Sequence, residues 1–590
     1  MKKITILFLL VACGLFAQNQ VDLQLVNTYK TGIFDDSGAE ILAYDPTTKK
    51  VFYTNASLNE IGVLDVSDLN NITKTEITLP AGGVNSVDYA NGHIAVALED
   101  TNKQANGQVL FYNVNGTFVS SVTVGALPDM VTFSPNEQMV ITANEGEPND
   151  DYSVDPLGSV SIIDISGGIA NVSQSDVSTL DFTAFNNNID SLVRINGNNG
   201  LATVAEDLEP EYVAVSEDNT KAYVALQENN AIAIVDLTQK TITDVFGLGY
   251  KDWSVVGNEL DASDKRSDVH FTSYNNLYGM YMPDATKFFS IGGMNYIATA
   301  NEGDGREYDN FEDEEKVSKL SLDTVAFPNY AELQEDTVLG RLNVSATDGD
   351  IDGDGDFEKL FAFGGRSFSI WNADTKTLVY DSGDEIEKKV FADDPMHFNS
   401  TNDDNDSFKN RSDNKGPEPE AIEIGKLGGY TLAFVGLERQ GGIMTFDISS
   451  PNNPMLVGYT NNRNWAVDAD DGTAGDLGPE DIIYVNPNQS PNGKPMLLVA
   501  NEVSGTISFF EITSNFISIE EAHSTSFSVY PNPTQNIVKM SAKDQYQVLD
   551  LNGNVMFITS ETQQVDLSKL PSGVYFLQNS KGFYAKVIKE

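Results

Sequence analysis

The sequence predicts an all-β protein in two parts, a ring of repeated β-sheets followed by a small β-sandwich. The first observation is a unit that recurs between residues 22 and 515: an acid or amide, an apolar strand, a turn and a second apolar strand. The second is a series of short alternating strands and turn residues in 527–590. The third is the composition, since 40% hydrophobic residues and a single cysteine among 590 residues indicate a large core without disulfide bonds.

At the amino terminus, residues 1–17 are predicted to be a secretory signal peptide. Two lysines precede the apolar run 4–16, and Ala17 offers a small-residue cleavage point. The apolar run is too short to cross a membrane as a helix, so the mature chain is expected to have no transmembrane span. The alternative is a lipobox that would attach a lipid to Cys13, but the apolar run continues beyond this cysteine.

The repeated unit predicts a seven-bladed β-propeller over residues 22–515. In each copy the second strand ends in Asn or Glu, as in 139–145 and 296–302, and a third strand of the form I-x-V-x-D follows most of them. Such units match the four-stranded blades of a propeller, in which neighbouring blades bury each other's faces. The copies begin at Glu40, Asn85, Asp129, Glu211, Asp284, Glu420 and Glu480.

Two segments bear on how the ring closes and how many blades it has. The last copy lacks its fourth strand, and residues 21–29, ahead of the first copy, are expected to supply it and so remove an open sheet edge. An eight-bladed ring is the alternative, with 360–370 as a separate blade. We expect this segment to be the outer half of the fifth blade instead, because no acid-plus-strand start precedes it.

Propeller geometry predicts that the recurring acids gather at one end of the ring. The residue before the first strand of a blade and the residue that ends the second strand lie on the same face, here called the mouth. The long insertions emerge on this face too, and binding sites usually lie on loops held by a rigid scaffold. The insertions follow Glu147 and occupy 181–207, 250–282, 306–358, 381–419 and 462–478.

The charge balance narrows the possible partners. A net charge of −51 argues against binding to nucleic acid or to an anionic membrane surface. Crowded carboxylates require bound metal, neighbouring Arg or Lys, or protonation. With one cysteine and four histidines in the chain, oxygen ligands remain, which favours calcium. The candidate metal ligands at the mouth are Glu145, Glu211, Glu302, Asp304, Glu420, Glu438, Glu480 and Glu502.

A second candidate calcium site lies in the segment D-G-D-I-D-G-D-G-D-F-E at 348–358. Acids at every second position, with glycines that permit a sharp turn, can wrap a calcium ion. The segment is not a full EF-hand, because neither register places Glu at its twelfth position. The alternative is a solvated acidic hairpin loop. The candidate ligands are Asp348, Asp350, Asp352, Asp354 and Asp356.

Three residues are candidates for chemistry on a bound anion. Arg306 lies in the acidic segment N-E-G-D-G-R-E-Y, and Arg439 directly follows Glu438. Either guanidinium could clamp an anionic substrate or neutralise its acidic neighbours. His270 is the only histidine in a mouth insertion, where it could act as an acid or base. The sequence contains no G-x-S-x-G elbow, P-loop or dinucleotide fingerprint.

The carboxyl-terminal strands carry a specific resemblance. The motifs Y530-P-N-P533, V548-L-D-L-N-G553 and L570-P-S-G-V-Y575 occur in order within 527–590, after a polar linker at 516–526. This set resembles the type A C-terminal sorting domain of the type IX secretion system of Bacteroidetes. The resemblance implies the type IX secretion machinery as a partner and a final location outside the cell or at its outer surface.

Residues 22–513 resemble the choice-of-anchor I family of secreted bacterial proteins. The family is named for the anchor that its members carry, and some relatives carry alkaline-phosphatase labels. The matching stretches are T142-A-N-E-G-E-P-N149, T299-A-N-E-G-D-G-R-E-Y308, D350-I-D-G-D-G-D356, F363-G-G-R-S-F-S-I-W371, P417-E-P-E420 and G478-P-E-D-I482.

Three functions stay open, because fold alone does not decide among them. The first is a calcium-binding propeller that binds a glycan, polymer or protein on its acidic, insertion-rich face. The second is a calcium-dependent phosphoesterase of the alkaline-phosphatase or phytase type, in which Arg306 and Arg439 would bind phosphate. The third is a structural adhesin that uses calcium only for folding.

Overall fold

The computed structural model describes residues 20–309, 311–516, 527–550, 555–580 and 584–590. The predicted signal peptide, residues 1–17, lies outside the described residues, as does nearly all of the predicted linker at 516–526. The chain divides into two compact units, Met1–Asn515 and Phe516–Glu590.

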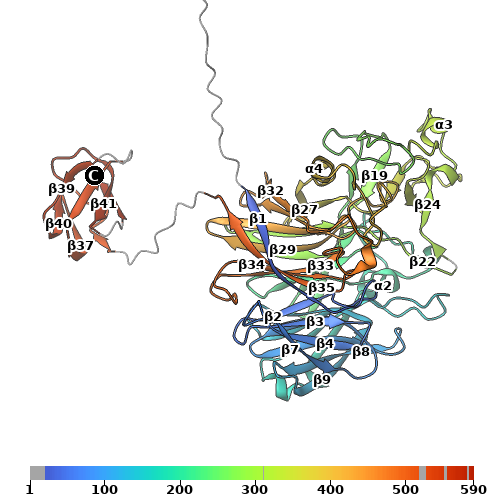
Figure 1. The fold of residues 1–590 in the computed structure, drawn as a ribbon, viewed down its shortest axis with the longest axis horizontal. Coiled ribbons are helices and arrows are strands. Elements are labelled where there is room, and N and C mark those ends of the chain that lie inside the picture. Colours follow the sequence, from blue (N-terminus) through green and yellow to red (C-terminus); the bar gives the residue numbers. More distant parts are fainter. Residues whose placement is uncertain (1–19, 310, 517–526, 551–554, 581–583) are drawn as a thin grey trace, which may run out of the picture. The chain divides into compact units, whose positions relative to one another are not determined.

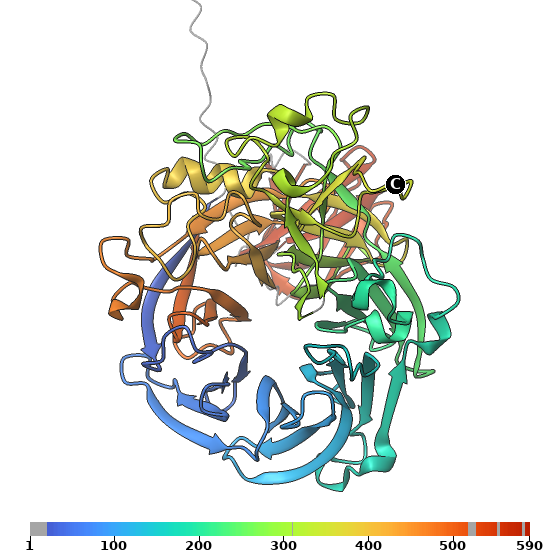
Figure 2. The same ribbon diagram turned by 90° about the vertical axis from the view of Figure 1, so that its right-hand side faces the viewer.

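Seven four-stranded antiparallel sheets, the blades, form the first unit within the described residues, and they are arranged in a ring (Figure 2). Blade one consists of β2 (Leu42–Asp45), β3 (Lys50–Asn55), β4 (Glu60–Asp65) and β5 (Thr73–Thr78). Blade two consists of β6 (Gly83–Ala90), β7 (His93–Glu99), β8 (Asn106–Asn113) and β9 (Phe118–Ala126). Blade three consists of β10 (Pro128–Phe133), β11 (Met139–Asn144), β12 (Ser159–Asp164) and β13 (Val177–Asp181). Blade four consists of β14 (Val213–Val215), β15 (Lys221–Leu226), β16 (Ala231–Asp236) and β17 (Thr241–Gly247). Blade five consists of β20 (Thr286–Ile291), β21 (Met294–Asn301), β27 (Ser367–Asn372) and β28 (Thr377–Asp381). Blade six consists of β29 (Pro419–Leu427), β30 (Tyr430–Leu437), β31 (Ile443–Asp447) and β32 (Met455–Thr460). Blade seven consists of β33 (Pro479–Val485), β34 (Met496–Asn501), β35 (Thr506–Ser514) and β1 (Val21–Lys30).

The ring closes through its first strand, as the sequence predicts. β1 lies antiparallel to β35, with Val21 opposite Ser514 and Lys30 opposite Thr506 (Figure 1). The outermost strand of blade seven therefore comes from the start of the folded chain and its three inner strands from the end. Because β1 covers the free edge of β35, backbone hydrogen bonds within blade seven join the start of the folded chain to its end and close the ring.

Local sequence explains the tight hairpins between inner strands. In blade two, Asn91 and Gly92 separate β6 from β7, and both have positive φ, 45° and 80°. Two consecutive residues in the left-handed region form the type I′ turn that Asn-Gly favours, because its twist matches that of the strands.

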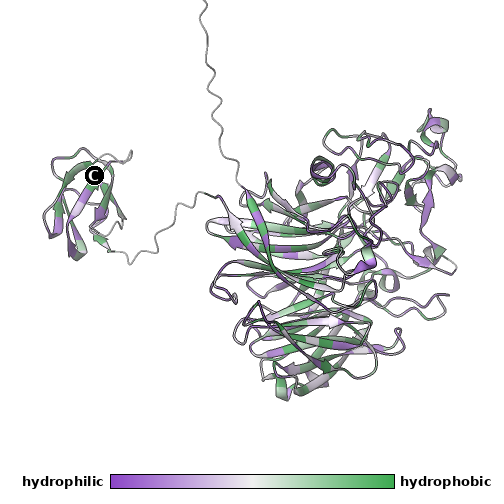
Figure 3. Cartoon of the chain, in the orientation of Figure 1, coloured by the Kyte–Doolittle hydropathy of each residue, from purple (hydrophilic) through white to green (hydrophobic). Residues whose placement is uncertain are grey.

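Apolar side chains fill the spaces between neighbouring blades. Accordingly, hydrophobic residues either alternate with hydrophilic ones along a strand or follow one another without interruption (Figure 3). One cluster joins blade one to blade seven: Tyr53 and Val51 of β3 pack with Leu498 of β34 and Phe509 of β35, and all four are at most 1% exposed. Equivalent clusters link blades one and two, two and three, three and four, four and five, and five and six. This core fixes the radial position of every inner strand, and so of the acids at their ends.

The segment 360–370 is divided between two sheets. Its end belongs to β27, the third strand of blade five, as predicted for an outer part of this blade. Its start, β26 (Leu360–Ala362), instead pairs in parallel with β19 (Leu277–Met280) in an added sheet that also contains β18 (Tyr250–Asp252). The eight-bladed alternative is therefore wrong, because the segment forms no blade of its own.

Most remaining elements of this unit lie in the insertions, which buried ion pairs bind to one another. Lys409 lies 3.1 Å from Asp261, and Arg366 lies 2.9 Å from Glu387. The insertion elements are β22 (Glu307–Tyr308), β23 (Phe311–Glu312), β24 (Glu314–Lys316), β25 (Asn343–Ser345), α1 (Gly197–Gly200), α2 (Val204–Asp207), α3 (Tyr330–Leu333), α4 (Glu385–Asp393) and the 3₁₀ helices η3 (Thr183–Phe185), η4 (Val317–Lys319) and η5 (Ala469–Asp471). Two further 3₁₀ helices, η1 (Ile169–Asn171) and η2 (Gln174–Asp176), lie between β12 and β13 of blade three.

The second unit consists of two antiparallel sheets that share one core. Phe527, Val538 and Val565 from one side pack with Val548 and Leu577 from the other, and all are buried. One sheet has the order β36 (Val529–Tyr530), β37 (Ile537–Asp544), β40 (Thr562–Asp566), and the other the order β39 (Val555–Ile558), β38 (Tyr546–Leu549), β41 (Gly573–Asn579), β42 (Tyr584–Lys589).

Candidate metal centre at the mouth of the propeller

A short motif, proline followed by an acid, positions several carboxylates at the mouth. In blades three, six and seven the first strand begins with this motif, and the strand ladder shifts register immediately after the proline. A bulge of this kind frees one residue from the ladder and re-aims its side chain. The shifts lie between Pro128 and Val131, Pro419 and Ile422, and Pro479 and Asp481.

Eight carboxylates from six blades form the mouth set. Among the residues that the structure describes, none of them lies within 4.0 Å of a nitrogen of Lys, Arg or His. All are wholly or largely buried in the propeller, which makes uncompensated negative charge costly. We call them the mouth carboxylates: Glu40, Asp129, Glu145, Glu211, Glu228, Asp284, Glu420 and Glu480.

Three mouth carboxylates carry an oxygen with no partner at all. The Oε2 atoms of Glu211, Glu228 and Glu420 are buried and accept no hydrogen bond in the structure. Glu228 is 8% exposed and Glu420 is 9% exposed, so water cannot readily replace the missing donor. Buried acceptors of this kind are rare in folded proteins and require an explanation.

Two groups of mouth carboxylates converge closely enough to share one ion. In the first group, one oxygen from each of Glu145, Glu211 and Glu228 lies within 4.8 Å of the others. In the second, the same holds for the mouth carboxylates Asp284 and Glu420 and for Glu302, which also lies 3.2 Å from Lys415. The donors are all carboxylate oxygens, which suit a hard divalent cation such as calcium.

A neighbouring group, formed by Glu302, Glu418 and Glu438, also consists of carboxylates, but lysine and arginine side chains of the protein pair with it. Glu418 is fully buried and accepts from Arg411, while Arg439 lies 3.0 Å from Glu438. Lys415 lies 3.2 Å from Glu302 and 3.4 Å from Glu418, in the position that a cation would take. Because three cations surround Glu418, its pKa falls to about 2, whereas burial raises the pKa of Glu302, of Glu438 and of the mouth carboxylates. The chain thus supplies cations to Glu302, Glu418 and Glu438 and leaves the adjacent carboxylates of Glu145, Glu211, Glu228, Asp284 and Glu420 without a basic partner.

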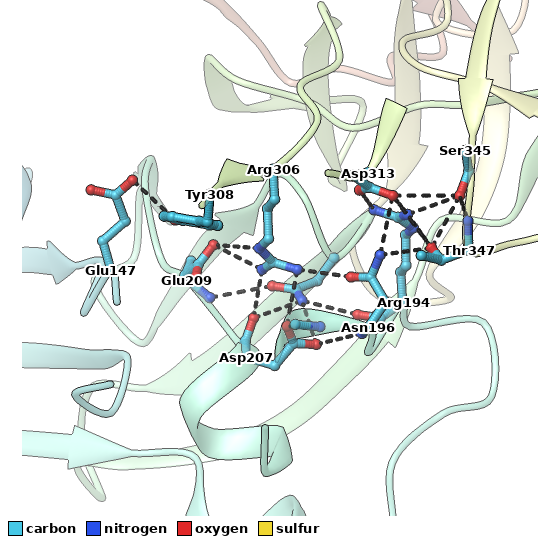
Figure 4. A network of polar contacts seen from close by, with 12 residues as sticks. Glu147, Arg194, Asn196, Asp207, Glu209, Arg306, Tyr308, Asp313, Ser345 and Thr347 are labelled. Atoms are coloured by element: carbon cyan, nitrogen blue, oxygen red, sulfur yellow. Dashed lines mark hydrogen bonds and ion pairs between the residues drawn. The ribbon is translucent and has the colours of Figure 1, made fainter. Parts of the chain in front are cut away.

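Arg306 is held in place by the insertions rather than left free for a ligand (Figure 4). Its Nε and Nη2 donate to Glu209 at 3.0 and 2.8 Å, and Nη2 also donates to the backbone oxygen of Asp207. Its Nη1 contacts Asn196 at 3.0 Å and the Asp207 carboxylate at 2.9 Å. These contacts use all five guanidinium donors, so none remains for an anionic substrate.

Two further candidates also differ from expectation. Arg439 donates from Nε to Glu418 and from Nη1 to Asn402, and Nη1 also contacts the Glu438 carboxylate. The side chain of Arg439 is 29% exposed. His270 is exposed and belongs to none of the metal-compatible groups of the described residues, and its backbone N–H donates to Asp261. The structure does not bring His270, Arg306 and Arg439 together around one reaction centre.

The other predicted metal ligands divide into those that converge and those that do not. Glu145, Glu211 and Glu420 lie in the two converging groups without a basic partner, Glu302 lies in the second of them but is paired with Lys415, and Glu438 lies with Glu302 and Glu418 in the paired group. Glu480 is a mouth carboxylate outside both groups, Glu502 accepts from Ser37, and Asp304 has a half-exposed side chain 3.5 Å from Lys415.

The acidic loop at 348–358 forms two small exposed groups that share Glu358. One contains Asp350 and Asp352, and the other contains Asp354 and Asp356. Asp348 is in neither group, because its carboxylate accepts from Arg194 Nε at 2.7 Å. A calcium site in this loop stays a prediction, and Asp348 is not positioned to contribute to it.

Several residues of the site were not among the predicted ligands. Glu228 and Asp284 lie in the two converging groups, and Glu358 in the loop groups. Their position at strand ends and at the end of the loop repeats the pattern of the predicted acids. Lys415, which pairs with Glu302, and Glu209, which pairs with Arg306, come from segments between the blade strands, whose paths no repeat pattern reveals.

The titration of the mouth carboxylates follows from their burial. Burial is the main cause that raises the pKa of Glu40 and Glu228 to about 7 and that of Asp129 to about 6. Neighbouring carboxylates raise several of them further, and the pKa of Glu211 and of Glu420 lies well above its ordinary value for both reasons.

Without divalent cations, stability is expected to fall as pH rises from 5 to 8. Glu40, Glu228 and Asp129 bind protons more tightly in the folded chain, so the folded state holds more protons than the unfolded state across this window. The free energy of unfolding then decreases with pH, by on the order of 1 kcal/mol or more for each such group. Urea unfolding in a chelator at several pH values measures this, and stability that rises toward pH 8 would contradict it.

A cavity of about 690 Å³ opens from the mouth along the innermost strands. Its wall follows β2, β6, β10 and β33 from the mouth to their far turns, and Glu40, Asp129 and Glu480 lie at the mouth end. The ring of blades, the insertions, the mouth carboxylates and the cavity together define the class of protein. It is a β-propeller whose acidic mouth carries long insertions and lies over a central channel.

Comparison with known proteins gives the family. Residues 40–451 match the model of the choice-of-anchor I domain, and residues 528–590 match that of the secretion system C-terminal sorting domain. The chain belongs to the choice-of-anchor I family. Its sorting domain shows that it is a secreted protein of the outer cell surface and a client of the type IX secretion machinery. Among the described residues, no helix has the length and apolar character needed to cross a membrane.

Two curated relatives are animal proteins. Gigasin-3a of Magallana gigas is 36% identical over 193 residues, 30% of this chain and 66% of the relative. The mesenchyme-specific cell surface glycoprotein of Strongylocentrotus purpuratus is 30% identical over 294 residues, 44% of this chain and 37% of the relative. The chain therefore spans about two thirds of the first relative and little more than a third of the second.

Similar solved structures include other propellers. The β-propeller domain of Cps50 (Swd1) from Myceliophteria thermophila has a TM-score of 0.40 at 8% identity, covering 83% of this chain and 100% of that one. The WD40 β-propeller domain of Doa1 has a TM-score of 0.39 at 9% identity, covering 83% and 97%. These likenesses concern the fold alone.

Proposed function

We propose that this surface propeller binds calcium at its mouth and presents the bound ions to an oxygen-rich extracellular ligand. The observation that carries the proposal is the pair of converging carboxylate groups, in which the buried Oε2 atoms of Glu211, Glu228 and Glu420 have no protein donor. The neighbouring acids Glu302 and Glu438, by contrast, have lysine or arginine partners.

The donor set fits calcium better than smaller or softer metals. Calcium accepts six to eight oxygen ligands in flexible geometry, whereas magnesium demands an octahedron and zinc prefers nitrogen and sulfur. Three carboxylates in each group leave coordination positions for further oxygens. Hydroxyl or anionic oxygens of a glycan, polymer or protein would complete the shell from the open side of the mouth.

The phosphoesterase alternative loses its phosphate-binding residues. It relied on Arg306 and Arg439, and carboxylates of the protein already hold both guanidinium groups. We therefore propose binding rather than hydrolysis as the function of the mouth.

Thermal unfolding of the full chain tests the calcium part directly. Calcium at about 1 mM, the range used by extracellular modules, is expected to raise Tm by several degrees, and a chelator to reverse the rise. Magnesium at the same concentration is the control and is expected to have a smaller effect. If Tm is the same with calcium and with chelator, the proposal fails. If calcium raises Tm but no glycan, polymer or protein binds only in its presence, the ligand part fails and a structural adhesin remains.

A further inference from the structure

Two insertions that are far apart in the sequence meet at one buried lysine and one buried aspartate. Lys409 of the insertion 381–419 and Asp261 of the insertion 250–282 are both fully buried. The Nζ atom of the lysine lies 3.1 Å from Oδ2 of the aspartate. Because both groups have lost their contact with water, keeping both charges is costly even when they are paired. Burial therefore favours a reaction that removes both charges at once.

The hydrogen bonds of Lys409 leave one position of its nitrogen open toward Asp261. Among the described residues, Nζ donates to the backbone oxygens of Asp268 at 2.8 Å and of Arg266 at 3.4 Å. It makes no hydrogen bond to Oδ2 of Asp261 despite the short contact. An ammonium group has three N–H donors, and the two backbone oxygens use two of them. Loss of the third proton leaves a lone pair, which is what a nucleophilic amine requires.

Only one oxygen of the Asp261 carboxyl group is hydrogen-bonded within the part of the chain that the structure describes. Oδ1 accepts from the backbone N–H of His270 at 3.0 Å, whereas the buried Oδ2 accepts from no donor. A backbone N–H on one oxygen stabilises the negative charge that develops there when a nucleophile adds to the carboxyl carbon. The other oxygen has no donor to hold it and can leave.

A second buried pair of the same residue types differs at the carboxyl group. Nζ of Lys251 also lies 3.1 Å from an oxygen of Asp381. Oδ1 of Asp381 accepts from a backbone N–H, and Oδ2 accepts from the hydroxyl groups of Ser367 and Ser369. These donors stabilise Asp381 as a carboxylate. The unsatisfied oxygen thus distinguishes Asp261 from an ordinary buried partner of lysine.

The two segments that hold Lys409 and Asp261 are packed against each other. The backbone N–H of Lys409 donates to the backbone oxygen of Phe398 at 2.8 Å. The ring of Phe398 lies 5.6 Å from the ring of Phe271, centroid to centroid, and Phe271 directly follows His270, which donates to Asp261. Two groups that the fold holds in contact react intramolecularly, and this removes the entropic cost of bringing them together.

We propose that Lys409 and Asp261 form an intramolecular isopeptide bond. Nζ transfers one proton to Oδ2, and the neutral amine attacks Cγ of Asp261. The Nζ–Cγ bond forms and the Cγ–Oδ2 bond breaks, and Oδ2 leaves as water with two protons that both come from Nζ. A neutral amide replaces the buried ion pair. The bond joins two mouth insertions in a chain whose only cysteine, Cys13, lies in the predicted signal peptide. It does not rest on the proposed calcium binding.

Peptide mapping by mass spectrometry tests the proposal on the purified full chain. We expect trypsin to release one branched peptide that joins the segments of Asp261 and Lys409, lighter than their sum by one water molecule, without cleavage after Lys409. Lys409→Arg keeps the positive charge and is expected to abolish the branched peptide. The matched control Lys251→Arg replaces the other buried lysine and is expected to retain it. Separate, unmodified peptides from the parent would overturn the proposal, as would water loss confined to one peptide.

Refolding shows whether the fold itself makes the bond. Chain that is kept in denaturant from synthesis onward is expected to lack the branched peptide. It should acquire the peptide after dilution into buffer, once circular dichroism shows that the strands have formed, because the reaction requires the folded geometry. A refolded chain without the branched peptide, or a branched peptide that is present before refolding, would contradict a bond formed by the folded protein.

Discussion

Replacing Arg306 by methionine is expected to destabilise the propeller by about 3–5 kcal/mol. The guanidinium is buried, and its removal leaves the buried carboxylates of Asp207 and Glu209 without their cation. Five donor contacts are lost at once, and the hydrocarbon side chain of methionine replaces none of them. Because these contacts join three separate segments of the chain around residues 196, 207 and 306, the insertions are expected to loosen together.

Urea unfolding at pH 7 with and without the substitution measures the loss. Lys319→Met is the control, because the ion pair of Lys319 with Glu315 is exposed and such pairs contribute little. A loss in Arg306→Met no larger than in Lys319→Met would contradict the structural role. If the parent binds phosphate, and Arg306→Met loses this binding while its stability is unchanged, then Arg306 has a role in anion binding.

The second large effect is expected from the double variant Glu211→Gln, Glu228→Gln. In saturating calcium it should lose most of the calcium-dependent stabilisation, on the order of 3 kcal/mol at a hundred times the dissociation constant. In a chelator at pH 8 the same variant should be more stable than the parent. The substitution removes two buried, mutually repelling carboxylates and supplies amide donors. Thermal unfolding in both conditions measures the two opposite changes.

Glu418→Gln provides the matched comparison for this variant. Glu418 is just as buried, but it is paired with Arg411, Lys415 and Arg439. Its replacement should destabilise the chain in calcium and in chelator alike, because it leaves three cations short of a partner. If the two variants behave alike, the difference between carboxylates with and without a basic partner has no energetic meaning.

The fold could be predicted because each blade repeats the same local rule. An acid, an apolar strand, a turn and a second apolar strand define the two innermost strands, and residues 21–29 were expected as the closing strand before β1 was seen beside β35. The gathering of acids at one mouth followed from the same rule. Proline before the acid in blades three, six and seven was visible in the sequence, but its consequence, a bulge, depends on strand pairing.

The partners of the acids could not be predicted in the same way. Lys415 reaches Glu302 from an insertion more than a hundred residues away, and Arg306 turns toward Glu209 of a different insertion. Insertions have no repeat, so their paths depend on packing that sequence patterns do not encode. Consequently the sequence indicated which residues are acidic and where they lie, but not which of them the protein itself neutralises.

Anomalous scattering from a crystal of the full chain grown with calcium tests the central claim most directly. The account predicts calcium peaks about 2.3–2.6 Å from carboxylate oxygens of Glu211 and Glu228, and of Asp284 and Glu420. A mouth that contains no ion while calcium is present, with those carboxylates hydrogen-bonded to one another or to water, would contradict it.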